Sequence, residues 1–332
     1  MPTLPLMTPA STNPDAYRRM TAPGGYEAWR FSATSDDGTM HLVAALHAGW
    51  ALDRRYLRRY WAYRHWPTRF APPVPQDYPA VTFALYQGGR RPVVVTMPAK
   101  KEEFSADDTG AAIRVNATHA QRGAQDVFNL HVRAATDDGR TLTARFTFRP
   151  QVRADAQALL TGSAAAGEHG WVIADPLCDV NGEITIFDEA GGPPRATSFA
   201  GAGCHDHVYG TRAMGDAGKD WLIGHVLREE SAVLFRQAGA EPARLCEASP
   251  GQPVRLRETT LVIEGVSRTA RGIGYPSAIV IPEVAELAEP KVISSTWLAV
   301  MLEYQATVGN DRAVALVEIL RPRRCIWPLP WD

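Results

Sequence analysis

Cysteine is scarce in this sequence of 332 residues, which contains only four: Cys178, Cys204, Cys246 and Cys325. They are widely separated and form no CxxC pair, so their spacing disfavours both a zinc-finger module and a small disulfide-linked scaffold. We therefore expect reduced and mostly buried thiols.

Long apolar runs and an excess of one charge are also lacking. The first twenty residues contain no apolar stretch typical of a signal peptide, and no segment approaches the roughly 18 apolar residues of a membrane-spanning helix. Lys and Arg total 35 against 36 for Asp and Glu, so no overall charge attracts the chain to nucleic acid. We expect a cytoplasmic protein without a nucleic-acid partner.

Strand patterns separated by turn signatures dominate the chain. Two apolar-rich arms around a central turn predict hairpins over 29–49, 81–98 and 128–150. Asn181-Gly182 predicts a further turn before Glu183–Ile186. In the second half, strands are expected over 221–229, 231–239, 254–265, 296–308 and 313–322. Many short strands with glycine-rich turns are typical of a sandwich or barrel.

A helical pattern occurs once, over 53–66, where Leu52, Tyr56, Tyr60 and Tyr63 recur at helical spacing. The Ala- and Gly-rich stretch 151–170 separates two strand-rich runs and is the candidate linker. We therefore predict an all-β protein of antiparallel strands with few short helices. Its parts are an N-terminal tail (1–23), a first domain (24–165) and a second domain (166–332).

The segment GAGCHDHVYG (201–210) places three titratable residues side by side in a small and apolar context. On a strand, Asp206 would share one face with Cys204 and Val208, while His205, His207 and Tyr209 share the other. A carboxyl that points into an apolar barrel has a raised pKa, so Asp206 could donate a proton to a double bond or polarise a carbonyl. His205 and His207 could act as bases.

Two other interpretations of this segment stay open. The two histidines lie on one face and could supply two metal ligands, although the sequence indicates no third one. Alternatively, the three polar groups hold a glycine-rich segment together by hydrogen bonds. The prediction adopted here is proton chemistry without a metal or another cofactor.

GAGCHDHVYG resembles the GxGYHDHNWG motif of the lipocalin-like hydroxyneurosporene synthase (carotenoid 1,2-hydratase) and AttH-like family. Further similarities follow in the family's order: GYEAWRF (25–31) with SDDG (35–38), YPAV (78–81) with the strand that follows, and WLIGH (221–225). The resemblance extends from about residue 24 to about residue 322. It implies two lipocalin-like β-barrel or sandwich domains and a pocket for a hydrophobic ligand.

By the same resemblance, Asp206 corresponds to the acid with which the hydratases protonate a terminal double bond. Five residues depart from the family pattern: Ala28, Cys204, Val208, Tyr209 and His225, the last of which replaces a permanent cation by a titratable group. Two of these changes remove aromatic rings that could stabilise a cation, so we expect a substrate different from that of the carotenoid enzymes.

Several other residues are candidates for the site. Glu27 lies between aromatic residues and could be a second acid or base, or a buried structural carboxylate. The predicted substrate-binding residues are Trp29, Tyr209, Trp221, His225 and Trp297, for each of which packing in a core is the alternative. His41 and His47 are expected to be structural.

The segment 54–70 contains six arginines among tyrosines and tryptophans. It could contact an anionic membrane during uptake of a hydrophobic substrate, or form a helix that covers a barrel mouth. The sequence leaves the oligomeric state open. It predicts a cofactor-free enzyme that hydrates, cyclises or isomerises an unsaturated, terpenoid- or polyene-like molecule. The alternatives are a Diels–Alderase-type pericyclase and a non-catalytic lipid or pigment carrier.

Overall fold

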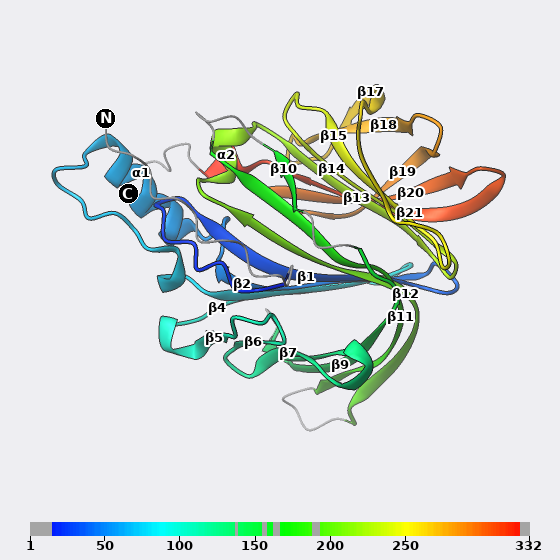
Figure 1. Cartoon of the computed structure of the whole chain (residues 1–332), viewed down its shortest axis with the longest axis horizontal. Coiled ribbons are helices and arrows are strands. Elements are labelled where there is room, and N and C mark those ends of the chain that lie inside the picture. The colour runs from blue at the N-terminus through cyan, green and yellow to red at the C-terminus, as the bar shows by residue number, and fades with distance from the viewer. Residues whose placement is uncertain (1–14, 137–138, 155–157, 162–166, 188–192, 326–332) are drawn as a thin grey trace.

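The computed structural model describes residues 15–136, 139–154, 158–161, 167–187 and 193–325. Two large antiparallel sheets face each other, and each is strongly curved (Figure 1). The first is drawn in blue to green and the second in yellow to red. The predicted all-β class, with antiparallel strands and few short helices, is confirmed.

The first sheet has 12 strands in the order β4-β3-β2-β1-β12-β11-β9-β8-β7-β6-β5, with β10 paired to β11. Their bounds are β1 Tyr26–Ser35, β2 Met40–Gly49, β3 Ala80–Gln87, β4 Val93–Pro98, β5 Phe104–Ala106, β6 Ala112–Val115, β7 Thr118–Arg122, β8 Phe128–Ala135, β9 Thr141–Val152, β10 Ala158–Thr161, β11 His169–Phe187 and β12 Arg195–Gly210. Strands β1 and β12 lie side by side in this sheet, although about 170 residues separate them in the sequence.

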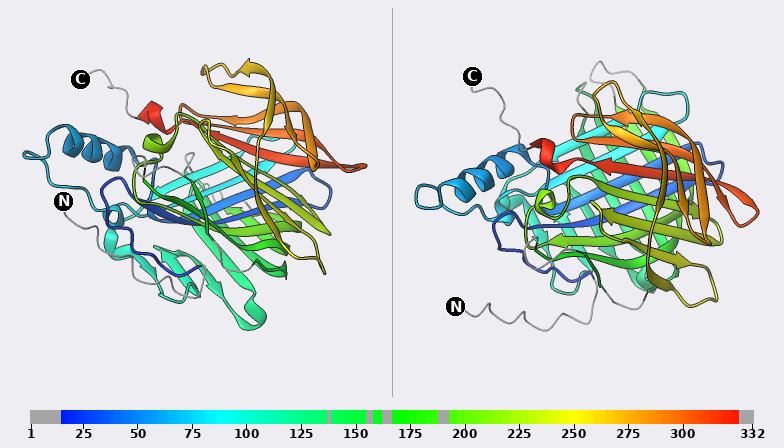
Figure 2. Two further views of the ribbon diagram at one scale, coloured as in Figure 1. Left: turned by 45° about the horizontal axis from the view of Figure 1, so that its top comes forward. Right: turned by 90° about the horizontal axis from the view of Figure 1, so that it is seen from above.

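The second sheet has nine strands in the order β16-β15-β14-β13-β21-β20-β19-β18-β17. Their bounds are β13 Trp221–Arg228, β14 Ser231–Ala238, β15 Ala243–Ala248, β16 Arg255–Thr259, β17 Val262–Arg268, β18 Gly274–Ile281, β19 Ala285–Ser295, β20 Ala299–Val308 and β21 Asp311–Leu320. Figure 2 shows this sheet lying across the first one.

Helices are few in the described residues. They are α1 Arg54–His65, α2 Met214–Ala217 and the 3-10 turns η1 Pro75–Asp77, η2 Lys101–Glu103, η3 Ala124–Asp126 and η4 Pro322–Cys325. The predicted helix over 53–66 is α1, which begins after the N-cap Asp53 and buries Tyr56, Leu57 and Tyr60. None of the helices described here has the length and apolarity needed to cross a membrane.

The predicted hairpins are present as β1–β2, β3–β4 and β8–β9. In the first, Gly38 has a φ of 68°, which a tight turn needs and which glycine adopts without strain. The turn residues 137–138 of the third hairpin lie outside the described residues. Its second arm alternates as predicted, because Leu142, Ala144, Phe146 and Phe148 are buried while their neighbours are not.

Two sequence predictions about strands are wrong. Asn181-Gly182 is no turn, since β11 runs through it without a break. A Cβ atom at Gly182 would lie 2.3 Å from the ring of Phe146, so this glycine admits a neighbouring ring and does not turn the chain. The single strand expected over 254–265 is two strands, β16 and β17, because the chain leaves one before it begins the other.

The chain passes from the first sheet to the second at a different place from the predicted domain boundary. Strands β11 and β12 follow residue 165 but pair with β9 and β1 of the first sheet, and the second sheet begins at Trp221. The candidate linker contains β10, which pairs with β11. A domain boundary between residues 165 and 166 remains a prediction, because sheet membership does not define domains.

Each sheet covers its own apolar core, and a third core lies between the sheets. Trp29 and Phe31 of β1 point into the concave side of the first sheet, where they pack with Phe128 and Phe148. The alternate residues of β1 face the second sheet. Strand β1 and its neighbour β12 therefore separate two chemically different surroundings.

Candidate functional site

Strand β12 sends the three residues of the His-Asp-His segment to opposite sides of the first sheet. His205 and His207 lie on the side of Phe31 and Trp29, with which their rings stack at centroid distances of 4.3 and 4.6 Å. Cys204 and Val208 belong to the apolar core between the sheets. Because side chains alternate along a strand, Asp206 shares that side, as the sequence predicts.

His205 is part of a sealed ionic network. Its Nε2 lies 3.0 Å from Oδ1 of Asp15, and its Nδ1 lies 2.9 Å from the carbonyl oxygen of Arg30. Arg122 bridges Asp15 and Asp175 at 2.6 and 3.1 Å. Burial disfavours the imidazolium, but the charge and hydrogen bond of Asp15, together with Asp175 and the carbonyl group of Arg30, outweigh it and raise the pKa of His205.

Asp15 shows the reciprocal effect. Burial acts to raise the pKa of its carboxyl, but His205, which contributes both charge and a hydrogen bond, together with Arg122 lowers that pKa to about 2. Both side chains are fully buried. The pair is therefore a buried salt bridge, which fixes the N-terminal segment against the first sheet.

His207 and Glu27 form a second buried pair on the same side. Nε2 of His207 lies 3.0 Å from Oε1 of Glu27, and the backbone N–H of Arg18 donates to the same oxygen at 2.7 Å. Nearby, the indole N–H of Trp29 donates to the carbonyl oxygen of Asp15 at 2.9 Å. The structure thus brings His207 and Glu27 together, but on the side of the sheet opposite Asp206.

Asp206 is 7% exposed and is held by a neighbouring indole. The N–H of Trp171 donates to its Oδ2 at 2.6 Å. In the β1–β12 register Asp206 is paired with Arg30. Its surroundings therefore include a hydrogen-bond donor and a cation in addition to the apolar groups expected from sequence.

A cavity of about 730 Å³ lies between the two sheets. Its walls come from β1 to β4 and β12 of the first sheet and from β13, β14 and β19 to β21 of the second. Most of the lining is apolar, including Val43, Phe83, Val208, Ile223, Met301 and Leu320. The size and the apolar character suit a small organic ligand, for which pockets span about 300–1,000 Å³.

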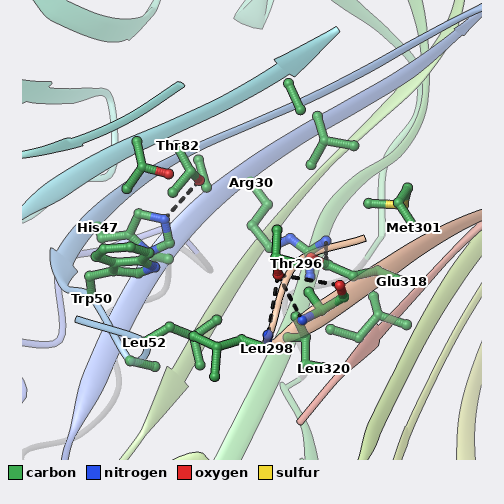
Figure 3. A pocket seen from close by; sticks show the side chains of 18 of the residues that line it. Arg30, His47, Trp50, Leu52, Thr82, Thr296, Leu298, Met301, Glu318 and Leu320 are labelled. Carbon is green, nitrogen blue, oxygen red and sulfur yellow. Dashed lines mark hydrogen bonds and ion pairs between the residues drawn. The ribbon is translucent and has the colours of Figure 1, made fainter. Parts of the chain in front are cut away.

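Polar groups gather in one part of this cavity: Tyr26, Arg30, Arg236 and Glu318, which we call the polar cluster. Nη2 of Arg30 lies 3.5 Å from Oε2 of Glu318. Figure 3 shows these two side chains meeting across the cavity from β1 and β21, apart from His47 and Trp50. Burial raises the pKa of Glu318, although Arg30 and Arg236 oppose this, so its carboxyl holds a proton more readily than usual.

Arg30 and Arg236 differ in how their charges are compensated. Burial disfavours the cation of Arg30, but Asp206 and Glu318 more than offset it and raise its pKa. Burial lowers the pKa of Arg236, whose one hydrogen bond is a long contact of 3.4 Å from Nη2 to the hydroxyl of Tyr26. The guanidinium of Arg236 also lies over the ring of Trp221, 4.6 Å from its centroid.

Two histidines lie in or near the cavity as uncharged groups. Burial, together with Arg30, lowers the pKa of His47 to about 3, and its Nε2 lies 3.0 Å from the hydroxyl of Thr82. Burial, with His41 and Arg30, lowers the pKa of His225 to about 3 as well. His47 lines the cavity, whereas His225 does not.

The predicted aromatic binding residues occupy different places. Trp297 lines the cavity and is 57% exposed, so it lies at the mouth. Trp221 does not line the cavity, and its ring packs against the guanidinium of Arg236. Trp29 and Tyr209 are buried on the other side of the first sheet, where Tyr209 donates to Glu168 at 3.0 Å. Substrate-binding roles for these residues remain predictions.

The basic helix α1 begins beside the cavity. Trp50, Leu52 and Arg54, at the start of the helix and just before it, line the cavity, and Trp66 and Phe70 beyond its end are exposed. This arrangement fits a helix at the mouth. Peripheral membrane contact through its arginines stays a prediction.

The described residues offer no further ligands for a metal ion at His205 and His207. In the ranges that the structure describes, no three His, Cys, Asp or Glu side chains are grouped so that they could hold a metal ion. Cys178, Cys204 and Cys246 are free and buried, and burial raises the pKa of each thiol. The side chain of Cys325 lies outside the described residues.

Sequence reasoning did not single out Arg236, Glu318 or the cavity position of His47. Arg236 follows Val233, Leu234 and Phe235 on β14, and Glu318 interrupts an apolar run on β21. A charged residue inside such a run was the available signal, because burying an isolated charge is costly without a purpose or partner.

The fold and the cavity together define a lipocalin-like protein built from two curled β-sheets. A solved structure described as AttH, from Nitrosomonas europaea, matches 96% of this chain and 98% of its own, with a TM-score of 0.62 and 13% identity. The kievitone hydratase of Nectria haematococca matches 94% of this chain and 93% of its own, with a TM-score of 0.54 and 11% identity.

A sequence relative agrees with the structural neighbours. The hydroxyneurosporene dehydrogenase of Chlorobaculum tepidum is 27% identical over 274 residues, which cover 79% of this chain and 70% of the relative. No established family model matches the chain. The resemblance to the lipocalin-like hydroxyneurosporene synthase and AttH-like family is thereby confirmed.

Proposed function

We propose that this protein is an enzyme that modifies an unsaturated, largely apolar small molecule in the cavity between its two sheets. The observation that carries the proposal is an apolar cavity of about 730 Å³ with four polar side chains gathered in one part of it. A carrier needs only the apolar walls. The relative named hydroxyneurosporene dehydrogenase supports a carotenoid-like polyene as the substrate class.

The chemistry we propose is acid–base catalysis by a carboxylic acid in an apolar chamber. Glu318 lines the cavity, and burial raises its pKa, so it can donate a proton to a terminal double bond. The proton and the two π electrons form a C–H bond, and the adjacent carbon becomes a cation. Water then adds to that carbon and returns a proton to the carboxylate, which completes a hydration. Capture by a second double bond, or loss of another proton, gives cyclisation or isomerisation.

Asp206 keeps its predicted role as a second candidate acid. Its carboxyl is held by Trp171 and faces Arg30, which in turn meets Glu318. Asp206 is not among the residues that line the cavity, so it has less support than Glu318 as the acid and would act on the reactant by positioning Arg30. Catalytic roles for His205, His207 and Glu27 have weaker support, since their side chains lie on the opposite side of the sheet from the cavity and bind other buried groups.

Incubation with a panel of polyenes and terpenoids, followed by mass spectrometry, tests the proposal. Hydration adds the mass of one water, whereas cyclisation or isomerisation changes retention at constant mass. A loss of two hydrogens would indicate dehydrogenation and contradict the acid–base mechanism. Recovery of every bound compound unchanged would support the carrier instead.

A pericyclase is the other catalytic candidate, because a shaped apolar pocket can hold a polyene in its reactive conformation without an acid. The variants Asp206→Asn and Glu318→Gln distinguish the two enzymes. A pericyclase tolerates both substitutions and responds to changes that fill the cavity, such as Ala45→Phe. An acid–base enzyme loses turnover when the carboxyl that donates the proton is replaced.

A further inference from the structure

Arg236 is a buried cation whose hydrogen-bonding capacity is largely unused. It is 2% exposed, and its Nε and Nη1 have no hydrogen-bond partner in the part of the chain that the structure describes. Nη2 makes one contact, to the hydroxyl of Tyr26 at 3.4 Å. Leaving donors of a buried charged group unsatisfied is unfavourable, and more so than for a neutral group.

The neighbouring acids are engaged elsewhere. Glu318 forms its ion pair with Arg30, and Asp206 accepts the N–H of Trp171. Within the described ranges no carboxylate lies within ion-pair distance of Arg236. Asp206 and Glu318 act on the charge of Arg236 from further away, so this second guanidinium has no carboxylate in direct contact among the described residues, while Arg30 has one.

Arg236 also faces the space that a ligand would occupy. It lines the cavity together with Tyr26, Arg30 and Glu318, and the ring of Trp221 supports its guanidinium from one side. The remainder of the cavity is mainly apolar. A hydrocarbon would fill the apolar part but would leave Nε and Nη1 of the guanidinium without an acceptor.

We propose that the cavity binds an apolar, unsaturated molecule that ends in a carboxylate, with this carboxylate held by the Nε and Nη1 donors of Arg236. The hydroxyl of Tyr26 is already bound to Nδ1 of His169 at 3.1 Å and serves to position Arg236. A carboxylate offers two acceptors and a negative charge in direct contact with Nε and Nη1, and such charge-assisted hydrogen bonds are stronger than those to a hydroxyl, which offers only an acceptor. This inference deepens the proposed function by naming the polar end of its substrate class. It also explains why an arginine is buried in an apolar wall.

Three retinoids of equal chain length test the inference, because retinoate, retinal and retinol differ only in the end group. Their binding is measured by quenching of tryptophan fluorescence, since Trp50 and Trp297 line the cavity. The wild type is expected to bind retinoate at least about tenfold more tightly than retinol, the ratio given by roughly 1.4 kcal/mol. Retinal should lie between them.

The variant Arg236→Met should lose this preference and bind the three retinoids with similar affinity. Arg236→Lys keeps the charge and should retain part of the preference, which covers the case in which the methionine variant does not fold. Arg228→Met is the matched control, because Arg228 forms an exposed ion pair with Asp311 away from the cavity, and it should keep the wild-type ratio. Circular dichroism confirms the fold of each variant.

Equal affinities for retinoate and retinol in the wild type, failure of retinoate to bind, or a preference that survives Arg236→Met in a folded variant would each overturn the inference. These results are separable from the fate of the proposed function. Turnover of a neutral polyene combined with unselective binding retains the enzyme and removes the carboxylate site. Selective binding of retinoate without turnover of any compound would retain the carboxylate site and remove the enzymatic function.

Discussion

The two sides of the first sheet at strand β12 solve the problem of buried charge in opposite ways. On one side, His205 lies 3.0 Å from Asp15 and His207 lies 3.0 Å from Glu27, so each histidine there has a carboxylate in direct contact. On the other side, the polar cluster combines one ion pair at 3.5 Å with Arg236, which has no carboxylate in direct contact among the described residues. Adjacent residues of one strand thus belong to different surroundings.

This difference between the two sides indicates which of them binds a ligand. The histidine-side network joins its acids and bases in direct contact and does not line the cavity, so it contributes to the structure and not to ligand binding. A buried group with unused donors, facing a cavity, has capacity for a molecule from outside. Matched substitutions on the two sides of the sheet test this difference.

The largest effect is expected from removing a carboxyl on the cavity side. Glu318→Gln should lower turnover about 100- to 10,000-fold, the range of a general acid. It also removes the carboxylate paired with Arg30, so circular dichroism must show that the variant is folded. Asp206→Asn tests the second candidate in the same assay. Turnover is followed by mass spectrometry on the substrate found with the polyene panel.

Glu264→Gln, an exposed residue of β17, is the control for a carboxyl-to-amide change. If turnover survives both Glu318→Gln and Asp206→Asn but disappears in folded variants of His205 or His207, the catalytic groups lie on the histidine side of the sheet and the proposal is contradicted.

A large loss of stability is expected on the histidine side. His205→Ala leaves Asp15 buried without its imidazolium partner, which should destabilise the fold by about 3–5 kcal/mol, the cost of breaking a buried ion pair. Urea unfolding measures the free energy. Loss of less than about 1 kcal/mol would contradict the view that this network holds the structure together.

The two sides should also respond to opposite changes in pH. The pKa of folded His205 is raised above its ordinary value of 6.5, so its stabilisation is complete below pH 6.5 and is lost as the pH rises through its folded pKa. The pKa values of His47 and His225 are lowered to about 3, so stability is lost as the pH falls from 6.5 towards 3. Asp15, lowered to about 2, adds a loss only below about pH 3.8.

Urea unfolding between pH 3 and 9 measures these effects. His205→Gln should remove the decline on the alkaline side, and His225→Gln should weaken the decline between pH 6.5 and 3. An unchanged alkaline limb in His205→Gln would show that this imidazole is not charged in the folded protein.

The smallest effect is expected at the mouth of the cavity. Trp297 lines it but is 57% exposed, so Trp297→Ala removes only part of a contact surface and should weaken retinoid binding less than about tenfold. Trp66→Ala, 49% exposed beyond the end of α1, is the control and should leave affinity unchanged. A larger loss at Trp297 than at Arg236 would place the main binding energy at the mouth.

Much of the fold could be predicted because local signals and tertiary structure agree in most strands. The Asp-Asp-Gly turn at 36–38 and the alternation in β9 depend on neighbouring residues only, so the sequence displays them directly. Gly182 shows the limit. Position 182 is glycine because the ring of Phe146, which is distant in sequence, packs against it. When only the neighbouring residues are considered, Asn181-Gly182 therefore looks like a turn.

The candidate site could be predicted only in part, for the same physical reason. Alternation along β12 correctly separates Asp206 from His205 and His207, because it is a local property of a strand. Which groups they meet depends on pairing across the whole chain: Asp15 lies 190 residues from His205, and Glu318 meets Arg30 from the other sheet. Neither partner can be inferred from spacing.

The attachment of Asp15 has a practical consequence for the region that resembles a tail in the sequence. Proteolysis between Asp15 and Tyr26 would release the carboxylate that neutralises His205 and the backbone donor of Arg18 that binds Glu27. Strand β12 would then carry charged groups without their partners, next to an apolar core that is exposed to solvent. Trimming this stretch to aid crystallisation or expression would therefore destabilise the first sheet.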